Sequence, residues 1–293
     1  MPITRAVLPV AGRGTRFLPV TKSVPKELLP VVDRPCLDYI VAEAVEAGMG
    51  DIVLVTAPGK EAIEDYFSTD TELEAHLESV GKEDLLKEVK RAARLAKVVS
   101  VYQHEALGLG HAVLTARPCM NDGESFAVLL GDDILVSETP AIGQLAALYD
   151  QVHTGSHPPC TISLMEVPRE KTDRYGICSG DMNGRTMRIS GMVEKPPPAE
   201  APSNQAIVGR YVLPYDIFDI LEQTPKGRGG EIQLTDALAV LADQGRAWGW
   251  VTEGVRHDTG NPLGLIRATL HFALQRPDLA PGLRQIIAEL PQE

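Results

Sequence analysis

The sequence predicts an α/β fold in which a mostly parallel sheet is covered by helices on both faces. Short apolar, β-branched runs recur along the first half of the chain, and each has the length of a buried strand. They lie at residues 6–8, 52–55, 98–102 and 126–130, with helical patterns between them at 37–47 and 111–117. Strands that alternate with helices are joined by right-handed crossovers, which make neighbouring strands parallel.

The remaining elements follow in chain order. Residues 71–96 are rich in Glu, Lys, Leu and Ala at amphipathic spacing, which predicts a helical insertion of one or two helices. After a strand at 161–165 the pattern changes to short strands and turns around Gly176, Gly180 and Gly191. Helices are expected again at 215–221, 232–243 and 262–275, and a stiff exposed loop at 196–204.

No low-complexity linker divides the chain, so we expect one domain over 1–293, with a first half at 1–150 and a second at 151–293. A length of 293 residues and a hydrophobic content of 44% suffice for a real core. The formal charge of −12, from 28 basic and 40 acidic residues, repels polyanions. Nucleic acid is therefore not an expected partner.

Cysteine spacing and the N-terminus bear on the cellular compartment. The four cysteines are scattered without metal-ligand spacing, which predicts buried, reduced thiols. The N-terminus enters a strand-like run at once, without the apolar core of a signal peptide, and no segment is as long as a membrane span. We expect a cytoplasmic protein that does not associate with membranes.

The most informative segment is LPVAGRGTRFLP at 8–19, followed by KSVPKELLP at 22–30. It begins where the first strand ends, which is where open parallel sheets bind ligands. Gly12 and Gly14 allow backbone N–H groups to face an anion. Five cations precede Glu27, the first acidic residue of the chain. The segment therefore predicts a phosphate-binding loop, the alternative being a glycine turn with a solvated basic face.

Two phosphate-binding motifs are absent from this loop. It lacks the G-x-x-x-x-G-K-[ST] pattern of P-loop NTPases, and Gly12-Arg13-Gly14 does not continue into G-x-G-x-x-G. A dinucleotide-binding dehydrogenase is excluded on the same ground, because no downstream acidic ribose ligand completes the fingerprint.

These residues resemble the signature of the sugar nucleotidyltransferase superfamily, and the chain is similar to its bacterial UTP:glucose-1-phosphate uridylyltransferases over nearly its whole length. Further matching motifs are GLGHAV (108–113), GDDIL (131–135), VEKP (193–196), VGRYVL (208–213), GEIQLTDA (230–237) and HDTGN (257–261). The resemblance implies a Rossmann-like nucleotide-binding first half and a sugar-binding second half. It also implies Mg2+, with UTP and glucose 1-phosphate as substrates of an in-line displacement.

The resemblance assigns cations and carboxylates to the reacting phosphates. Arg16 and Lys26 match positions that contact the triphosphate. The alternative is that they are a pair of surface cations. Asp132 directly follows a buried strand, and Mg2+ prefers one or two carboxylates together with phosphate oxygens, so Asp132 is the leading metal ligand. Asp258 matches a second metal position, the alternative being a turn aspartate beside glycine.

For the sugar, the resemblance gives Glu194 the hexose hydroxyls and Lys195 a phosphate. A carboxylate accepts from two hydroxyls while the neighbouring ammonium faces an anion. Gly176 and Gly209 match stretches where the backbone approaches the hexose.

For the base, uracil offers an acceptor, a donor and an acceptor along its pairing edge. Backbone groups of Ala11 and Gly12, together with an amide side chain, could read this edge, and Gln103 matches the family's uracil contact. Glu27 and Gly108 match further nucleotide-binding positions, the latter just before a helix N-terminus.

Two alternatives stay open. A thymidylyltransferase using dTTP shares the fold, and GDDIL carries Gly where the uridylyltransferases often carry Pro. A non-catalytic nucleotide-sugar-binding protein is the other, although retention of Arg16, Lys26, Asp132 and Lys195 argues against it. The resemblance also implies a homodimer or homotetramer.

Overall fold

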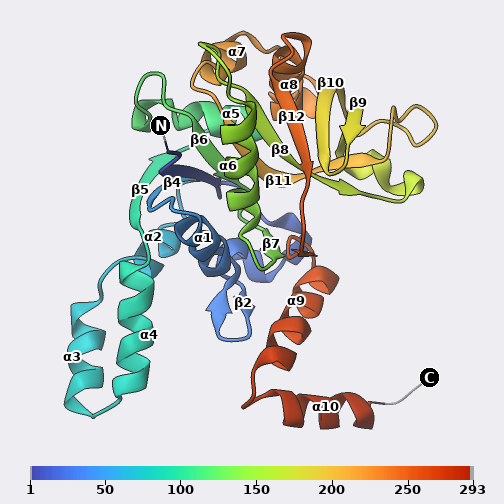
Figure 1. Ribbon diagram of the computed structural model, residues 1–293. Coiled ribbons are helices and arrows are strands. Elements are labelled where there is room, and N and C mark those ends of the chain that lie inside the picture. Colours follow the sequence, from blue (N-terminus) through green and yellow to red (C-terminus); the bar gives the residue numbers. More distant parts are fainter. Residues whose placement is uncertain (1, 291–293) are drawn as a thin grey trace.

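The computed structural model describes residues 2–290, and Arg228 by its backbone alone. One nine-stranded sheet runs through both halves of the chain (Figure 1). Its order is β5 (Lys97–Tyr102), β4 (Asp51–Thr56), β1 (Arg5–Pro9), β6 (Phe126–Leu129), β11 (Gln205–Leu213), β8 (Cys160–Glu166), β12 (Ala247–Val251), β10 (Thr186–Glu194) and β9 (Gly176–Asn183). Two small ribbons pair β13 (Val255–Asp258) with β7 (Asp133–Val136) and β2 (Pro30–Val31) with β3 (Arg34–Pro35).

The helices are α1 (Cys36–Glu46), α2 (Ala62–Tyr66), α3 (Thr71–Ser79), α4 (Glu83–Arg94), α5 (Leu109–Thr115), α6 (Ala141–Val152), α7 (Ile217–Gln223), α8 (Leu234–Asp243), α9 (Pro262–Gln275) and α10 (Ala280–Glu289). The insertion expected at 71–96 is confirmed as the hairpin of α3 and α4, which projects from the sheet (Figure 1). Helices α2, α6 and α10 were not predicted from the sequence. No helix within residues 2–290 is long and apolar enough to cross a membrane.

Alternation along β1 builds two cores on opposite faces of the sheet. Val7 packs in the cluster that contains α5, α7 and α8. Its neighbours Ala6 and Leu8 pack in a second cluster with α1, α6 and α9. Because successive strand residues point to opposite faces, a strand that is apolar at every position requires helices on both sides. The predicted α/β class with helices on both faces is thus confirmed.

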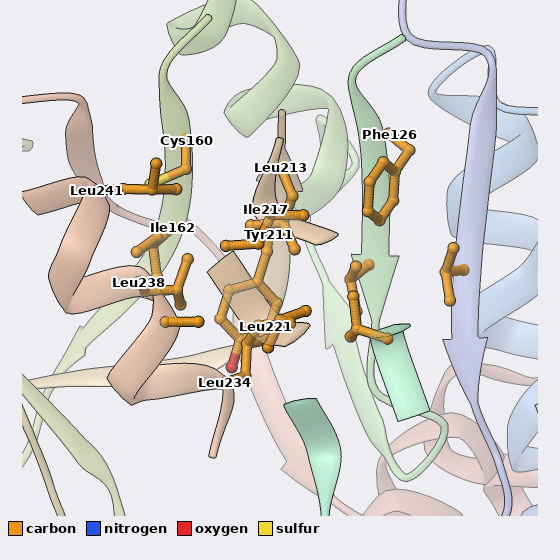
Figure 2. Close-up of a cluster of buried hydrophobic side chains, with 14 of the residues drawn as sticks. Phe126, Cys160, Ile162, Tyr211, Leu213, Ile217, Leu221, Leu234, Leu238 and Leu241 are labelled. Atoms are coloured by element: carbon orange, nitrogen blue, oxygen red, sulfur yellow. The ribbon is translucent and has the colours of Figure 1, made fainter. Parts of the chain in front are cut away.

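Figure 2 shows the first of these cores, where side chains from three strands meet two helices. Tyr211 and Leu213 of β11 lie between Phe126 of β6 and the β8 side chains, and apolar residues of α7 and α8 pack in the same cluster. These residues come from both halves of the sequence, so each half completes the core of the other.

The sheet is mixed, which corrects the expected mostly parallel arrangement. Parallel pairing joins β5, β4, β1 and β6, and again β8 and β12. Strand β11 is antiparallel to both β6 and β8, and β9 and β10 form one long antiparallel hairpin instead of short strands. Sequence reasoning missed β11 because Gly209 interrupts its pattern, where a positive φ of 50° accompanies a shift in register.

A buried ion pair links these layers. Arg210 of β11 is fully buried, and its guanidinium donates to both carboxylate oxygens of Glu43 on α1, from Nη2 at 2.7 Å and from Nε at 3.0 Å. Nη2 also donates to the main-chain oxygen of Asp133 at 2.6 Å, and Glu43 accepts from the backbone N–H of Ile142 on α6. One charge pair thus connects α1, α6, β7 and β11.

We expect Arg210→Met to lower the free energy of unfolding by about 3–5 kcal/mol, because it leaves the Glu43 carboxylate buried without its partner. Urea unfolding measures this. The double variant Arg210→Met with Glu43→Leu removes both charges and should regain much of the loss. A double variant no more stable than Arg210→Met alone would contradict this account.

Candidate active site

A cavity of about 750 Å³ opens beside the carboxyl end of β6, between the N-terminal loop and the β9–β10 hairpin. Its walls carry polar and charged groups from both halves of the sequence. The predicted site residues that line it are Arg16, Asp132, Gly176, Glu194, Lys195, Gly209 and Asp258. The tertiary structure therefore brings together residues up to 242 positions apart, between Arg16 and Asp258.

The N-terminal loop is shaped by Gly14. Its left-handed conformation, with φ of 63° and ψ of 33°, begins a short 3-10 turn at Thr15–Phe17. A Cβ on Gly14 would lie 3.1 Å from both Lys26 and Thr21, and Thr21 Oγ1 donates to the Gly14 carbonyl at 2.8 Å. Glycine is needed here because other residues rarely adopt this φ. The turn leaves Arg16 exposed at the cavity.

Lys26 forms an ion pair with Asp132 across the loop. Burial by itself lowers the pKa of an ammonium group, but the carboxylates of Asp132 and Glu27 together outweigh it, so the pKa of Lys26 is raised above 10.5. Lys26 is therefore charged at neutral pH. The cation predicted for the triphosphate and the carboxylate predicted for the metal lie side by side.

Asp132 and Asp258 lie on either side of Gly260. A Cβ at Gly260 would be 2.7 Å from Asp132 Oδ2 and 3.1 Å from Asp258 Oδ1, so the missing side chain leaves a space between two carboxylates. The Asp132 carbonyl accepts from both the N–H and the hydroxyl of Thr259, which fixes the two segments together. Two carboxylate oxygens around one small space suit Mg2+, which takes its other ligands from phosphates and water.

Glu194 and Lys195 lie at the end of β10, opposite the loop. Glu194 Oε2 accepts from Thr235 Oγ1 at 2.7 Å, and Oε1 pairs with Lys195 Nζ at 2.9 Å. A Cβ on Gly176 would lie 3.2 Å from Glu194 Oε2, so glycine leaves that carboxylate open to the cavity. Lys195 has a positive φ of 48°, and its N–H donates to the Tyr175 carbonyl at 2.9 Å. Such a conformation costs energy in a residue with a side chain and concentrates at functional sites.

Several predicted nucleotide residues are not among those that line the cavity, and they lie behind or beside the loop. Glu27 is 1% exposed and pairs with Lys60 at 2.8 Å. Burial raises the pKa of Glu27 above 4.5, and the ammonium of Lys60 opposes the shift. A Cβ on Gly12 would come into van der Waals contact with Lys26, 3.7 Å from its Cε, and Ala11 directly precedes Gly12.

Gln103 follows β5 and is 7% exposed. Its Nε2 donates to the Gly108 carbonyl at 3.2 Å and contacts His111 Nδ1 at 2.9 Å. Gly108 packs so closely on the segment before α8 that a Cβ would lie 2.7 Å from Glu231 Cβ. The amide nitrogen of Gln103 is thus engaged within the protein, which leaves Oε1 as the atom to read a base.

Sequence reasoning missed three charged residues. Lys60 holds Glu27, and Arg256 pairs with Asp133 through Nε and Oδ2 at 2.7 Å. Burial raises the pKa of Asp133 to about 6, against the opposing effect of Arg256. Two sequence features could have identified Arg256 and Asp133. Arg256 directly precedes the HDTGN motif, and Asp133 belongs to a pair of aspartates after a buried strand.

The fold and this cavity define the class of protein. A family model described as nucleotidyl transferase matches residues 5–274, and the chain belongs to that family and is a nucleotidyltransferase. Among its relatives is the UTP--glucose-1-phosphate uridylyltransferase of Bacillus subtilis (strain 168), 49% identical over 96% of this chain and 94% of the relative. That of Staphylococcus haemolyticus is 47% identical over 98% of both chains. Within the class, the chain belongs to the family of UTP--glucose-1-phosphate uridylyltransferases.

Solved structures are similar to this chain over nearly its whole length. The UTP-bound UGPase from Acinetobacter baumannii superposes with a TM-score of 0.89 at 43% identity, over 99% of this chain and 100% of that one. A UDP-glucose pyrophosphorylase complexed with UDP-glucose gives 0.84 at 37% identity, over 94% and 100%. A putative glucose-1-phosphate thymidylyltransferase from Bacillus anthracis gives 0.70 at 20% identity, which shows a shared fold alone.

The space at Gly260 can be tested with one methyl group. We expect Gly260→Ala to displace the Asp132 and Asp258 carboxylates and to weaken Mn2+ or Mg2+ binding roughly tenfold, measured by calorimetry. Gly260 has no positive φ, so the backbone tolerates alanine. Gly282→Ala in α10, where a Cβ meets nothing within 4 Å, is the matched control. Equal cation binding by both variants would remove this space from consideration as a metal site.

Proposed function

We propose that the protein transfers the uridylyl group of UTP to glucose 1-phosphate, giving UDP-glucose and pyrophosphate. The observation that carries this proposal is the meeting, in one cavity, of the cationic loop with Arg16, the carboxylates Asp132 and Asp258, and the Glu194–Lys195 pair. Relatives named for this reaction, and neighbours whose titles carry UTP and UDP-glucose, support it.

The reaction brings two anions together, so the residues must chiefly position them and neutralise their charge. A phosphate oxygen of glucose 1-phosphate attacks the α-phosphorus of UTP, and pyrophosphate leaves from the opposite side. Lys195, on the sugar side, offsets charge on the attacking phosphate. Arg16 and Lys26, on the loop, hold the triphosphate and stabilise the departing pyrophosphate. Glu194, its Oε2 oriented by Thr235, accepts from hexose hydroxyls.

Asp132 and Asp258 are the proposed ligands of Mg2+, and the space at Gly260 supports that assignment. When bound, the ion shields the negative charge of the phosphates. The Asp132 carbonyl is held by Thr259, so the ligand set is oriented by the main chain on both sides. A cytoplasmic location agrees with the proposed substrates, and a homodimer or homotetramer stays a prediction.

The function is tested by pyrophosphate release from purified protein with glucose 1-phosphate and UTP, dTTP, ATP, CTP or GTP in turn. We expect UTP to lead, EDTA to abolish the activity and Mg2+ to restore it. Lys195→Ala should fold normally and lose turnover by orders of magnitude, since its side chain lies at the cavity and outside the core. Faster pyrophosphate release with dTTP than with UTP would favour the thymidylyltransferase. Binding of UDP-glucose without turnover would favour a non-catalytic protein.

Two variants distinguish recognition of the base from binding of the triphosphate. If Gln103 Oε1 pairs with uracil, Gln103→Leu leaves part of the base unpaired and weakens UTP binding by about 1–3 kcal/mol, while pyrophosphate binding hardly changes. Arg16→Ala should weaken both ligands and keep the preference for uracil. Calorimetry with each ligand measures this, and a thermal melt checks that loss of the Gln103 contacts to Gly108 and His111 has not disturbed the fold. Equal loss of UTP and pyrophosphate by Gln103→Leu would place base reading elsewhere.

A further inference from the structure

Arg256 is a cavity cation for which the proposed reaction has no role so far. It lies on β13 two residues before Asp258, so the two side chains share one face of the strand. Its side chain is 17% exposed and lines the cavity together with Tyr175 and Glu194.

The guanidinium of Arg256 is fixed from two sides. Nε donates to Asp133 Oδ2 at 2.7 Å, and the central carbon lies 5.6 Å from the centre of the Tyr175 ring, whose hydroxyl accepts from Nη1 at 3.4 Å. Asp133 is 3% exposed, so the anchoring carboxylate cannot swing into solvent. Nη2 makes no hydrogen bond within residues 2–290. A rigid planar donor is thus held at the cavity wall with N–H groups to spare.

The surroundings of Arg256 select the sugar over the phosphates. Tyr175 leads directly into Gly176, and Asp133 Oδ2 would lie 3.3 Å from a Cβ on Gly209. Both glycines line the cavity, and Gly176 lies beside Glu194, because a Cβ there would be 3.2 Å from Glu194 Oε2. The Asp133 carboxylate balances the charge of Arg256, which reduces its attraction for a phosphate and leaves its N–H groups as hydrogen-bond donors.

We propose that Arg256 is a specificity-determining residue that donates a hydrogen bond from Nη2 to a hydroxyl oxygen of the hexose. Asp133 is its positioning residue. The assignment rests on the proposed function, in which the hexose of glucose 1-phosphate occupies this end of the cavity.

The test compares Arg256→Met with Arg188→Met. Arg188 is the matched control because it also stacks on an aromatic ring, that of Trp248 at 5.8 Å, but is not among the residues that line the cavity. With UTP saturating, Arg256→Met should lower kcat/KM for glucose 1-phosphate about ten- to hundredfold, as expected for a lost hydrogen bond to a charged donor. KM for UTP should stay within about twofold in both variants. Equal loss for both substrates would overturn the proposal.

A series of monodeoxy glucose 1-phosphates identifies the hydroxyl. The analogue that lacks it should be poor for the wild-type protein and no poorer for Arg256→Met, because the two changes remove the same hydrogen bond. Asp133→Asn should raise KM for glucose 1-phosphate and leave KM for UTP unchanged, a split that general loosening of the fold would not give. Additive losses for every analogue would overturn the proposal.

Calorimetry with UDP-glucose and UDP tests the role of Arg256 separately from the proposed function. Arg256→Met should lose affinity for UDP-glucose and keep its affinity for UDP. A wild-type protein that neither binds UDP-glucose nor uses glucose 1-phosphate would overturn the proposed function. A wild-type protein that does both, beside an Arg256→Met variant with unchanged affinity and kinetics, would overturn the role of Arg256 alone.

Discussion

The ion pair between Arg210 and Glu43 is the constraint on which the rest of the structure depends. A fully buried guanidinium is tolerable only where its donors are matched, and Glu43 together with the Asp133 carbonyl supplies the acceptors. Those acceptors come from α1 and β7, while Arg210 comes from the strand that joins the parallel and antiparallel parts of the sheet. Satisfying one charge therefore fixes how the two halves of the chain meet.

The contacts of Arg210 with Glu43 and Asp133 also position the residues of the cavity. Asp133 gives its main-chain oxygen to Arg210 and its carboxylate to Arg256, so one residue ties the buried pair to the cavity wall. Asp132 directly precedes it and faces Lys26. Cations and carboxylates alternate across a small space, which suits a reaction between two phosphates, because each negative charge that enters meets a positive group already held in place.

Glycines set the open volume of the site. At Gly260, Gly176 and Gly209 the nearest neighbour of an added Cβ would be a carboxylate or an apolar side chain within 3.2 Å. These positions keep the carboxylates of Asp132 and Glu194 accessible, whereas Gly108 serves close packing against the segment before α8. The same residue type thus makes space in one wall and contact in another, and the sequence motif alone does not distinguish the two uses.

By itself the sequence determined the strands of the first half, the helical insertion, the N-terminal glycine loop and the family, because these depend on local periodicity and on ordered motifs. It placed Arg16, Asp132, Glu194, Lys195 and Asp258 in one site, and the structure brings all five to one cavity. Only the tertiary structure decided the mixed sheet, the burial of Arg210, and the pairing of Asp133 with Arg256. The contact of Arg210 with Asp133 joins residues 77 positions apart, and that of Arg256 with Asp133 joins residues 123 positions apart. The energies of such contacts depend on burial and mutual geometry, which no local sequence pattern records.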